Sequence, residues 1–319
     1  MMDVFARGRE LRQLAPPGLI DLEDRAPWEG LNKVPFAFTH RLAGHPLFTI
    51  ERLAELSERV FERPDYRRHV RTSLPKEELR RRLREDILSI GTNGQWLSLH
   101  YIDEMHKDYA DLFESLLVDI EHVTGSSVRR QMEWGSMSVF MNAPGLKVPY
   151  HFDHETNFLM QIQGEKEVRL YPPGLATLTL DEIEDFYRYN PMAGRYRDDL
   201  ATAGQSFILK PGVAVHHPPL APHLIRNGKE ISVSVSLYYV TAEMEDQARV
   251  HQANYCLRKL GFRPRPVGSS SFWDGVKSGA MKGISKSKPR THDEMLYSGI
   301  QRIAAPMKLA KRAAQRLHR

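Results

Sequence analysis

The apolar residues of the first part of the chain repeat at the spacing of amphipathic helices. Leucine and valine recur at this spacing over 47–60, and a second helix is predicted over 74–87. A third is predicted over 103–123, where an apolar stripe runs up to Gly125, a residue that commonly follows a helix end. This pattern predicts a largely helical first 125 residues.

At Trp134 the pattern changes to short runs of β-branched and aromatic residues separated by proline and glycine. Eight such runs are typical of a β-sandwich or barrel, and we expect a jelly roll of cupin type, that is, a double-stranded β-helix with flanking helices. The eight runs cover 134–142, 147–152, 157–162, 167–172, 206–210, 213–218, 223–227 and 231–240.

Three regions follow from these patterns. Residues 1–125 are predicted to form an N-terminal arm and helical region, because four prolines precede residue 36 and helical patterns follow. Residues 126–240 form the predicted catalytic core, with an insertion over 175–204 that is too long for a hairpin. Residues 241–319 are predicted to be C-terminal helices and a basic tail.

Charge is distributed unevenly along the chain. The formal net charge is +5, but residues 277–319 contain 11 basic and 2 acidic residues, so the rest of the chain is slightly acidic. This disfavours nucleic-acid binding by the body. The tail is expected to dock on the body, to form a dimer element or to contact an anionic surface.

The composition of 41% hydrophobic and 27% charged residues fits a globular chain. No apolar run is long enough to span a membrane, and charged residues at the start argue against a signal peptide, so we expect a cytoplasmic protein. Cys256 is the only cysteine, which excludes internal disulfides and cysteine metal clusters. Any metal must therefore be bound by histidine and carboxylate.

One strand carries a pattern that suits such a metal. Side chains at i and i+2 of a strand share a face, so His151 and Asp153 can present an imidazole and a carboxylate to one point inside a barrel. A second histidine would complete the 2-His-1-carboxylate triad that non-haem Fe(II) oxygenases use. His216, His217 and His223 are the candidates for this third ligand.

The stretch 149–173 resembles the JmjC-type and related cupin-like Fe(II)/2-oxoglutarate oxygenases, and within them the asparaginyl hydroxylases that act on hypoxia-inducible factor. The resemblance covers the metal-binding core well, the rest of the barrel loosely and the ends hardly at all. The matching residues are His151, Asp153, Asn157, Phe158, Gln161, Ile162, Gly164, Lys166, Pro172 and Pro173.

The resemblance implies roles for individual residues. His151 and Asp153 would bind Fe(II), and His223, which follows a turn and precedes the last core strand, would be the third ligand. Lys166 would pair with the distal carboxylate of 2-oxoglutarate, since a buried dicarboxylate needs a counter-charge.

Five further residues are interpreted beside this pattern. Asn157 would lie beside the metal-bound carboxylate, and Ser236 occupies a position where the hydroxylases have an amide. The neighbouring His154 and Glu155 are interpreted as loop-surface residues, and His217 as a pocket-lining residue.

The implied activity is oxidative decarboxylation of 2-oxoglutarate coupled to hydroxylation of a small-molecule or peptidyl substrate. The insertion 175–204, with Tyr187, Tyr189, Arg195 and Arg197, is the predicted substrate lid. The alternative is a non-catalytic metal-binding cupin that acts as a sensor or scaffold. The apolar positions of 242–260 also suggest a homodimer through the C-terminal helices.

Overall fold

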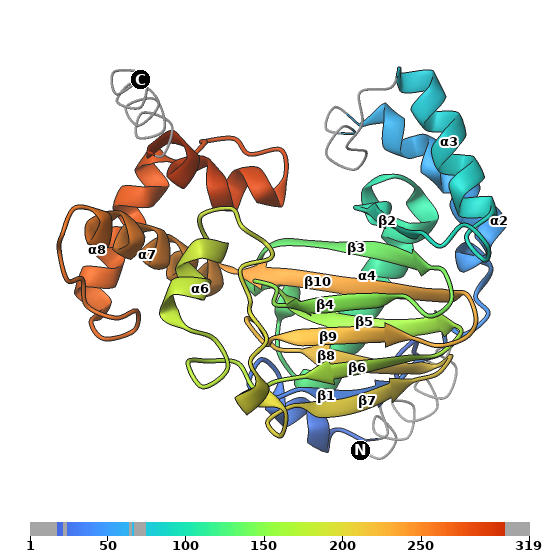
Figure 1. The fold of residues 1–319 in the computed structure, drawn as a ribbon, viewed down its shortest axis with the longest axis horizontal. Coiled ribbons are helices and arrows are strands. Elements are labelled where there is room, and N and C mark those ends of the chain that lie inside the picture. Colours follow the sequence, from blue (N-terminus) through green and yellow to red (C-terminus); the bar gives the residue numbers. More distant parts are fainter. Residues whose placement is uncertain (1–17, 22–23, 64–65, 67–74, 304–319) are drawn as a thin grey trace, which may run out of the picture.

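The computed structural model describes residues 18–21, 24–63, 66 and 75–303 (Figure 1). Its centre consists of two antiparallel β-sheets, with orders β1-β8-β5-β10-β3-β2 and β4-β9-β6-β7. The strands are β1 (Phe36–Thr39), β2 (Trp96–His100), β3 (Met132–Asn142), β4 (Lys147–His151), β5 (Thr156–Gln163), β6 (Lys166–Leu170), β7 (Gln205–Leu209), β8 (Val213–His217), β9 (His223–Asn227) and β10 (Ser232–Thr241).

The eight strands from β3 to β10 coincide with the eight predicted runs, so this prediction is confirmed. Along the chain they are shared between the sheets: β3, β5, β8 and β10 lie in the larger sheet, and β4, β6, β7 and β9 in the smaller. An architecture of two antiparallel sheets with this alternation is consistent with the predicted jelly roll.

The sequence patterns predicted neither β1 nor β2. These strands form the two edges of the six-stranded sheet, where β1 pairs with β8 and β2 pairs with β3. They have four and five residues, and each depends on a partner strand far away in the sequence. The region 1–125, predicted as an arm and a helical region, therefore also contributes these two short strands to the sheet.

The two faces of the six-stranded sheet have different roles. On β10, Val233, Val235 and Leu237 pack into the large core that also contains Leu116 of α4 (Lys107–Thr124). The alternate residues point between the two sheets, where Leu159 of β5 packs with residues of the smaller sheet. This alternation decides which side chains reach the barrel interior.

The predicted helices of the N-terminal region are present. Helix α3 (Lys76–Leu88) matches the expected 74–87, and α4 ends at Gly125, which has φ of +66° as expected for this kind of helix end. The other short helices are η2 (Ala26–Gly30), η3 (Pro46–Phe48), α2 (Ile50–Leu56), η4 (Ser57–Glu62), η6 (Ile102–Glu104), α5 (Val128–Gln131) and η7 (Asp198–Leu200).

The C-terminal helices gather with α6 (Leu180–Phe186) of the insertion at one end of the barrel (Figure 1). They are α7 (Ala242–Lys259), α8 (Ser271–Ile284) and a helical segment over 292–303, whose Leu296 and Ile300 are buried in a shared apolar cluster. The start of the predicted basic tail therefore docks on the body, while 304–319 lies outside the described residues. Among the described residues, no helix has the length and apolarity needed to cross a membrane.

Candidate functional site

The first two predicted metal ligands and His223 meet at the end of the smaller sheet. His151 ends β4 and His223 begins β9, and these two residues are register partners with ring centroids 4.1 Å apart. Asp153 lies two residues beyond β4 and places its Oδ2 atom 3.7 Å from Nε2 of His223. One ligand atom from each of the three residues lies within 4.8 Å of the other two.

Backbone carbonyls orient both imidazoles. Nδ1 of His151 lies 2.8 Å from the carbonyl oxygen of Pro149, and Nδ1 of His223 lies 3.2 Å from that of Ala221. A ring nitrogen that donates to a carbonyl fixes the tautomer and leaves the other nitrogen, Nε2, with a lone pair for a metal. The set therefore suits a divalent metal with nitrogen and oxygen ligands.

The three candidates for the third ligand have different surroundings. His216 uses both ring nitrogens, because Nδ1 donates to the carbonyl of Asn157 and Nε2 accepts from the backbone N–H of Asn32. His217, its neighbour on β8, points to the opposite face and is buried, with no partner for either nitrogen among the described residues. Only His223 combines with His151 and Asp153 into a metal-binding geometry.

Lys166 begins β6 and is 2% exposed. It shares a strand face with Val168 and Leu170, which pack between the sheets, so its side chain enters the barrel interior. No hydrogen bond or ion pair of its ammonium group occurs within the described part of the chain, and burial lowers the pKa of Lys166 to about 7. A buried ammonium without a partner is costly, and an anionic ligand would remove this cost.

A cavity of about 300 Å³ lies beside Asp153, over one face of the adjacent strands β5, β10, β3 and β2. Its walls include Asn157 and Ser236, whose hydroxyl donates a 2.7 Å hydrogen bond to Oδ1 of Asn157. Tyr238 and His292 also border it. The structure thus places Asn157 and Ser236 in contact with each other and next to the predicted ligand Asp153.

The surroundings of Asp153 and His223 disfavour the charged form of each side chain. Asp153 keeps 36% of its side-chain surface accessible because it borders the cavity, yet the surrounding protein still raises its pKa to about 6. Burial, with smaller contributions from the charges of His151 and His217, holds the pKa of His223 well below its usual value. A neutral His223 is the form that can bind a metal.

The structure differs from two predictions made from the sequence, one for His154 and one for the insertion 175–204. His154 is not a loop-surface residue: it is 2% exposed and its Nδ1 contacts the hydroxyl of Tyr187 at 2.9 Å. The insertion 175–204 does not border the cavity beside Asp153. Arg197 of the insertion instead lies 3.7 Å from Glu182 and lines a separate cavity of about 810 Å³.

His292 was missed by sequence reasoning. It comes from the C-terminal helical segment, borders the cavity and contacts Glu155 at 3.3 Å and Glu245 at 3.1 Å. Burial alone would lower its pKa, but these two contacts outweigh burial and raise the pKa of His292 to about 10. No spacing in the sequence connects His292 to the HxD motif, because the contact is made only by the folded C-terminal region.

No protein-family model and no curated protein matches this sequence. Solved structures similar to the chain include the X-ray structure of Escherichia coli YcfD, with 15% identity and a TM-score of 0.34 over 66% of this chain and 48% of that one. A structure of Escherichia coli ribosomal oxygenase YcfD has 16% identity and a TM-score of 0.31 over 58% of this chain and 45% of that one. A structure of the same ribosomal oxygenase with cobalt and 2-oxoglutarate has 15% identity and a TM-score of 0.31 over 66% of this chain and 47% of that one. The chain spans about half the length of these structures.

Proposed function

We propose that the chain is an Fe(II)/2-oxoglutarate-dependent oxygenase with a double-stranded β-helix core, most simply a hydroxylase. The observation that carries this proposal is the convergence of His151, Asp153 and His223 in a barrel that also encloses the ammonium of Lys166, which has no partner among the described residues. Two imidazoles and one carboxylate leave coordination positions open, as the non-haem Fe(II) oxygenases require.

In this proposal His151, Asp153 and His223 hold Fe(II), which together with 2-oxoglutarate supplies the activation of oxygen. Lys166 binds the distal carboxylate of 2-oxoglutarate, and its fit is supported by the absence of any other anionic partner among the described residues. Asn157, which accepts a hydrogen bond from Ser236, lies beside the carboxylate that binds the metal and helps to orient it. The apolar residues between the sheets exclude water from this chemistry.

The substrate would be a small molecule or a peptide that enters through the cavity beside Asp153. A closer relation to the asparaginyl hydroxylases would favour a peptide. We also propose that the chain forms a homodimer through its C-terminal helices. Large apolar side chains are exposed there, including Leu260 at 71%, Phe262 at 61% and Phe272 at 70%.

Succinate release tests this proposal. The chain with Fe(II), 2-oxoglutarate and oxygen should form succinate, at first slowly and without added substrate, and anaerobic mixing should give a weak visible charge-transfer band. Asp153→Ala should abolish both signals, whereas Glu165→Ala, an exposed carboxylate near Lys210, should change neither. Absence of succinate and of the band in folded, metal-loaded protein would instead favour a non-catalytic sensor or scaffold.

The substrate itself can be found by the same reaction. Candidate metabolites and peptides that accelerate succinate release would then be examined for a product heavier by one oxygen atom. A substrate that stimulates wild-type chain but leaves Asp153→Ala inactive would identify the accepted class. Stimulation without oxygen incorporation would contradict hydroxylation.

A further inference from the structure

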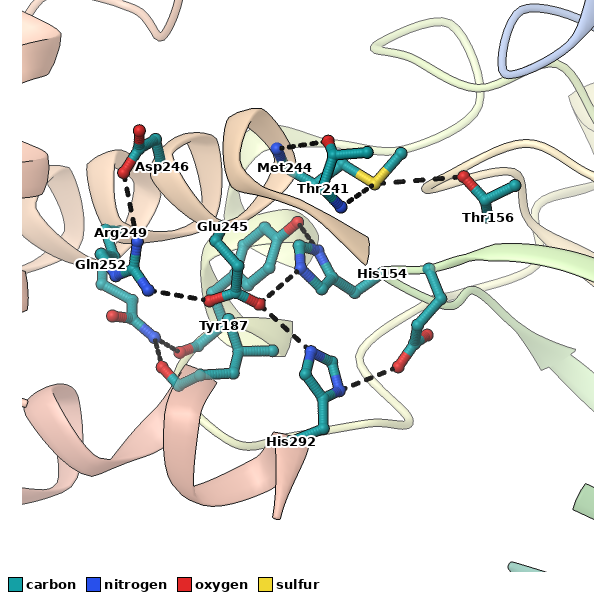
Figure 2. A network of polar contacts seen from close by, with 12 residues as sticks. His154, Thr156, Tyr187, Thr241, Met244, Glu245, Asp246, Arg249, Gln252 and His292 are labelled. Atoms are coloured by element: carbon teal, nitrogen blue, oxygen red, sulfur yellow. Dashed lines mark hydrogen bonds and ion pairs between the residues drawn. The ribbon is translucent and has the colours of Figure 1, made fainter. Parts of the chain in front are cut away.

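A second group of ligand-type side chains lies outside the predicted iron site. His154 follows the HxD motif, Glu245 lies in the first turns of α7, and His292 begins the C-terminal helical segment (Figure 2). Nε2 of His154 and Nε2 of His292 face the same carboxylate oxygen, Oε1 of Glu245, at 3.3 Å and 3.1 Å. One ligand atom from each residue lies within 4.8 Å of the other two.

The atoms that do not face this point have partners of their own. Nδ1 of His154 contacts the hydroxyl of Tyr187 at 2.9 Å, and Nδ1 of His292 lies 3.3 Å from Oε1 of Glu155. The other oxygen of Glu245 accepts a 3.1 Å hydrogen bond from Arg249 (Figure 2). Metal-binding histidines in proteins are usually held in this way, through a hydrogen bond from the second ring nitrogen to a carboxylate or another acceptor.

The separations suit a small divalent cation. With bond lengths near 2.1 Å, two ligands of a tetrahedral Zn²⁺ ion stand about 3.4 Å apart, close to the two nitrogen–oxygen distances to Glu245. All three side chains are buried, with exposures of 2% for His154, 1% for Glu245 and 5% for His292. The imidazole planes of the two histidines are nearly parallel, at 10° and a centroid separation of 5.7 Å.

The cluster also needs positive charge. Glu155 and Glu245 are two carboxylates that face the imidazoles, whereas Arg249 is the one guanidinium that contacts either of them among the described residues. Either protons on the imidazoles or a metal cation can supply the missing charge. A cation binds all three converging atoms at once, whereas each proton joins only one nitrogen to the carboxylate.

We propose that His154, Glu245 and His292 form a second divalent-metal site, of the Zn²⁺ type, distinct from the predicted iron site. The three ligands come from the loop after β4, from α7 and from the C-terminal segment. A bound ion therefore fastens the C-terminal region to the barrel beside the cavity that His292 borders. By closing long loops it stabilises the folded chain, and it does not take part in the oxygenase reaction.

The test uses the full chain with Asp153→Ala, so that the predicted iron site is disabled. After loading with Zn²⁺ and dialysis, this variant should retain one equivalent of zinc by elemental analysis, and zinc should raise its midpoint of thermal unfolding. Adding Glu245→Gln should weaken zinc binding at least about 100-fold, because it removes a ligand. Adding Tyr187→Phe should weaken it about 10-fold, because it removes only the hydroxyl that orients the ligand His154.

His251→Gln in the same background is the matched control, since this buried histidine of α7 stacks on Tyr187 but is not part of the converging set. It should retain the zinc. Loading with Co²⁺ gives a second readout, because a four-coordinate site produces an intense visible absorption that Glu245→Gln should abolish.

Lack of bound zinc in folded Asp153→Ala protein would overturn the proposal and leave a proton-linked cluster. Equal zinc binding with and without Glu245→Gln would overturn it as well. Neither result depends on succinate formation, so the oxygenase proposal and the second-site proposal can fail separately.

Discussion

The imidazole of His217 lies edge-on to that of His223, with ring centroids 4.5 Å apart and an interplanar angle of 67°. His217 is 2% exposed, and burial lowers its pKa to about 3, so the ring is neutral at physiological pH. Neither ring nitrogen has a hydrogen-bond partner within the described residues. A buried imidazole with two open nitrogens beside the predicted ligands is placed to bond a bound molecule or water.

His217→Leu should therefore affect binding rather than folding. It removes no hydrogen bond of the described protein, so the free energy of unfolding should change by less than about 1.5 kcal/mol. The dissociation constant of 2-oxoglutarate should rise about tenfold, the equivalent of about 1.4 kcal/mol for one lost hydrogen bond. Calorimetric titration with Mn²⁺-loaded protein measures this constant.

The neighbouring His216→Leu is the control. It removes the bonds to Asn32 and Asn157 and should destabilise the fold by about 1–3 kcal/mol. An unchanged 2-oxoglutarate affinity in folded His217→Leu would show that His217 is only a packing residue.

Lys166 should make 2-oxoglutarate binding dependent on pH. With a pKa of about 7 in the free protein, its side chain loses its proton above neutrality, and the dicarboxylate requires the charged form. The affinity should fall by up to about tenfold per pH unit between pH 7 and 8.5. In Lys166→Arg any remaining binding should be independent of pH in this range, because guanidinium stays charged.

The same shift predicts how stability changes with pH. The pKa of Lys166 is lower in the folded chain than the ordinary value of 10.5, so the unfolded chain binds more protons between about pH 7 and 10. The contribution of Lys166 to the free energy of unfolding should therefore rise with pH in this window. Lys166→Met should remove this rise, as chemical denaturation at pH 7 and 9 would measure. Identical pH profiles in both proteins would contradict the assigned burial.

Two serines of β10 distinguish an effect on the site from an effect on the stability of the sheet. Ser236 donates to Asn157 at the cavity, whereas Ser234 donates to Oε1 of Gln161 at 2.6 Å, away from the cavity walls. Either substitution by alanine should cost about 1 kcal/mol of stability. Only Ser236→Ala should also lower the rate of succinate formation. Equal rates in the two variants would argue against a role for Asn157 in the site.

Gly164 should be intolerant of any side chain. It has φ of +71° in the turn before Lys166, and an added Cβ atom would lie 2.3 Å from the carbonyl oxygen of Ile231. Gly145 has a similar φ of +74° but no atom within 4 Å of an added Cβ. Gly145→Ala should cost about 1–2 kcal/mol for the backbone conformation alone, and Gly164→Ala clearly more. Thermal unfolding of the two variants measures the difference, and equal losses would contradict the close approach.

The sequence by itself determined the eight core strands and the main helices. Alternating and continuous apolar runs are local properties, and β10 shows how far they reach: its valines and serines alternate, so one face fits the core and the other the barrel interior. The HxD pattern likewise depends on only three consecutive residues, at and just beyond the end of β4. Its metal-binding role remains a prediction, although the structure brings His151, Asp153 and His223 together.

Tertiary structure decided the rest, because it depends on contacts between distant segments. His216 and His217 are adjacent on β8, so their side chains point to opposite faces of the sheet. Which of these faces lies toward the barrel interior is decided by the position of β8 between β1 and β5. The edge strands β1 and β2 acquire their conformation from β8 and β3. His154 is buried, and His292 reaches the barrel, because α7 and the C-terminal segment pack across the end of β4 and β10. No local pattern encodes such a meeting, since it is produced by the packing of whole elements.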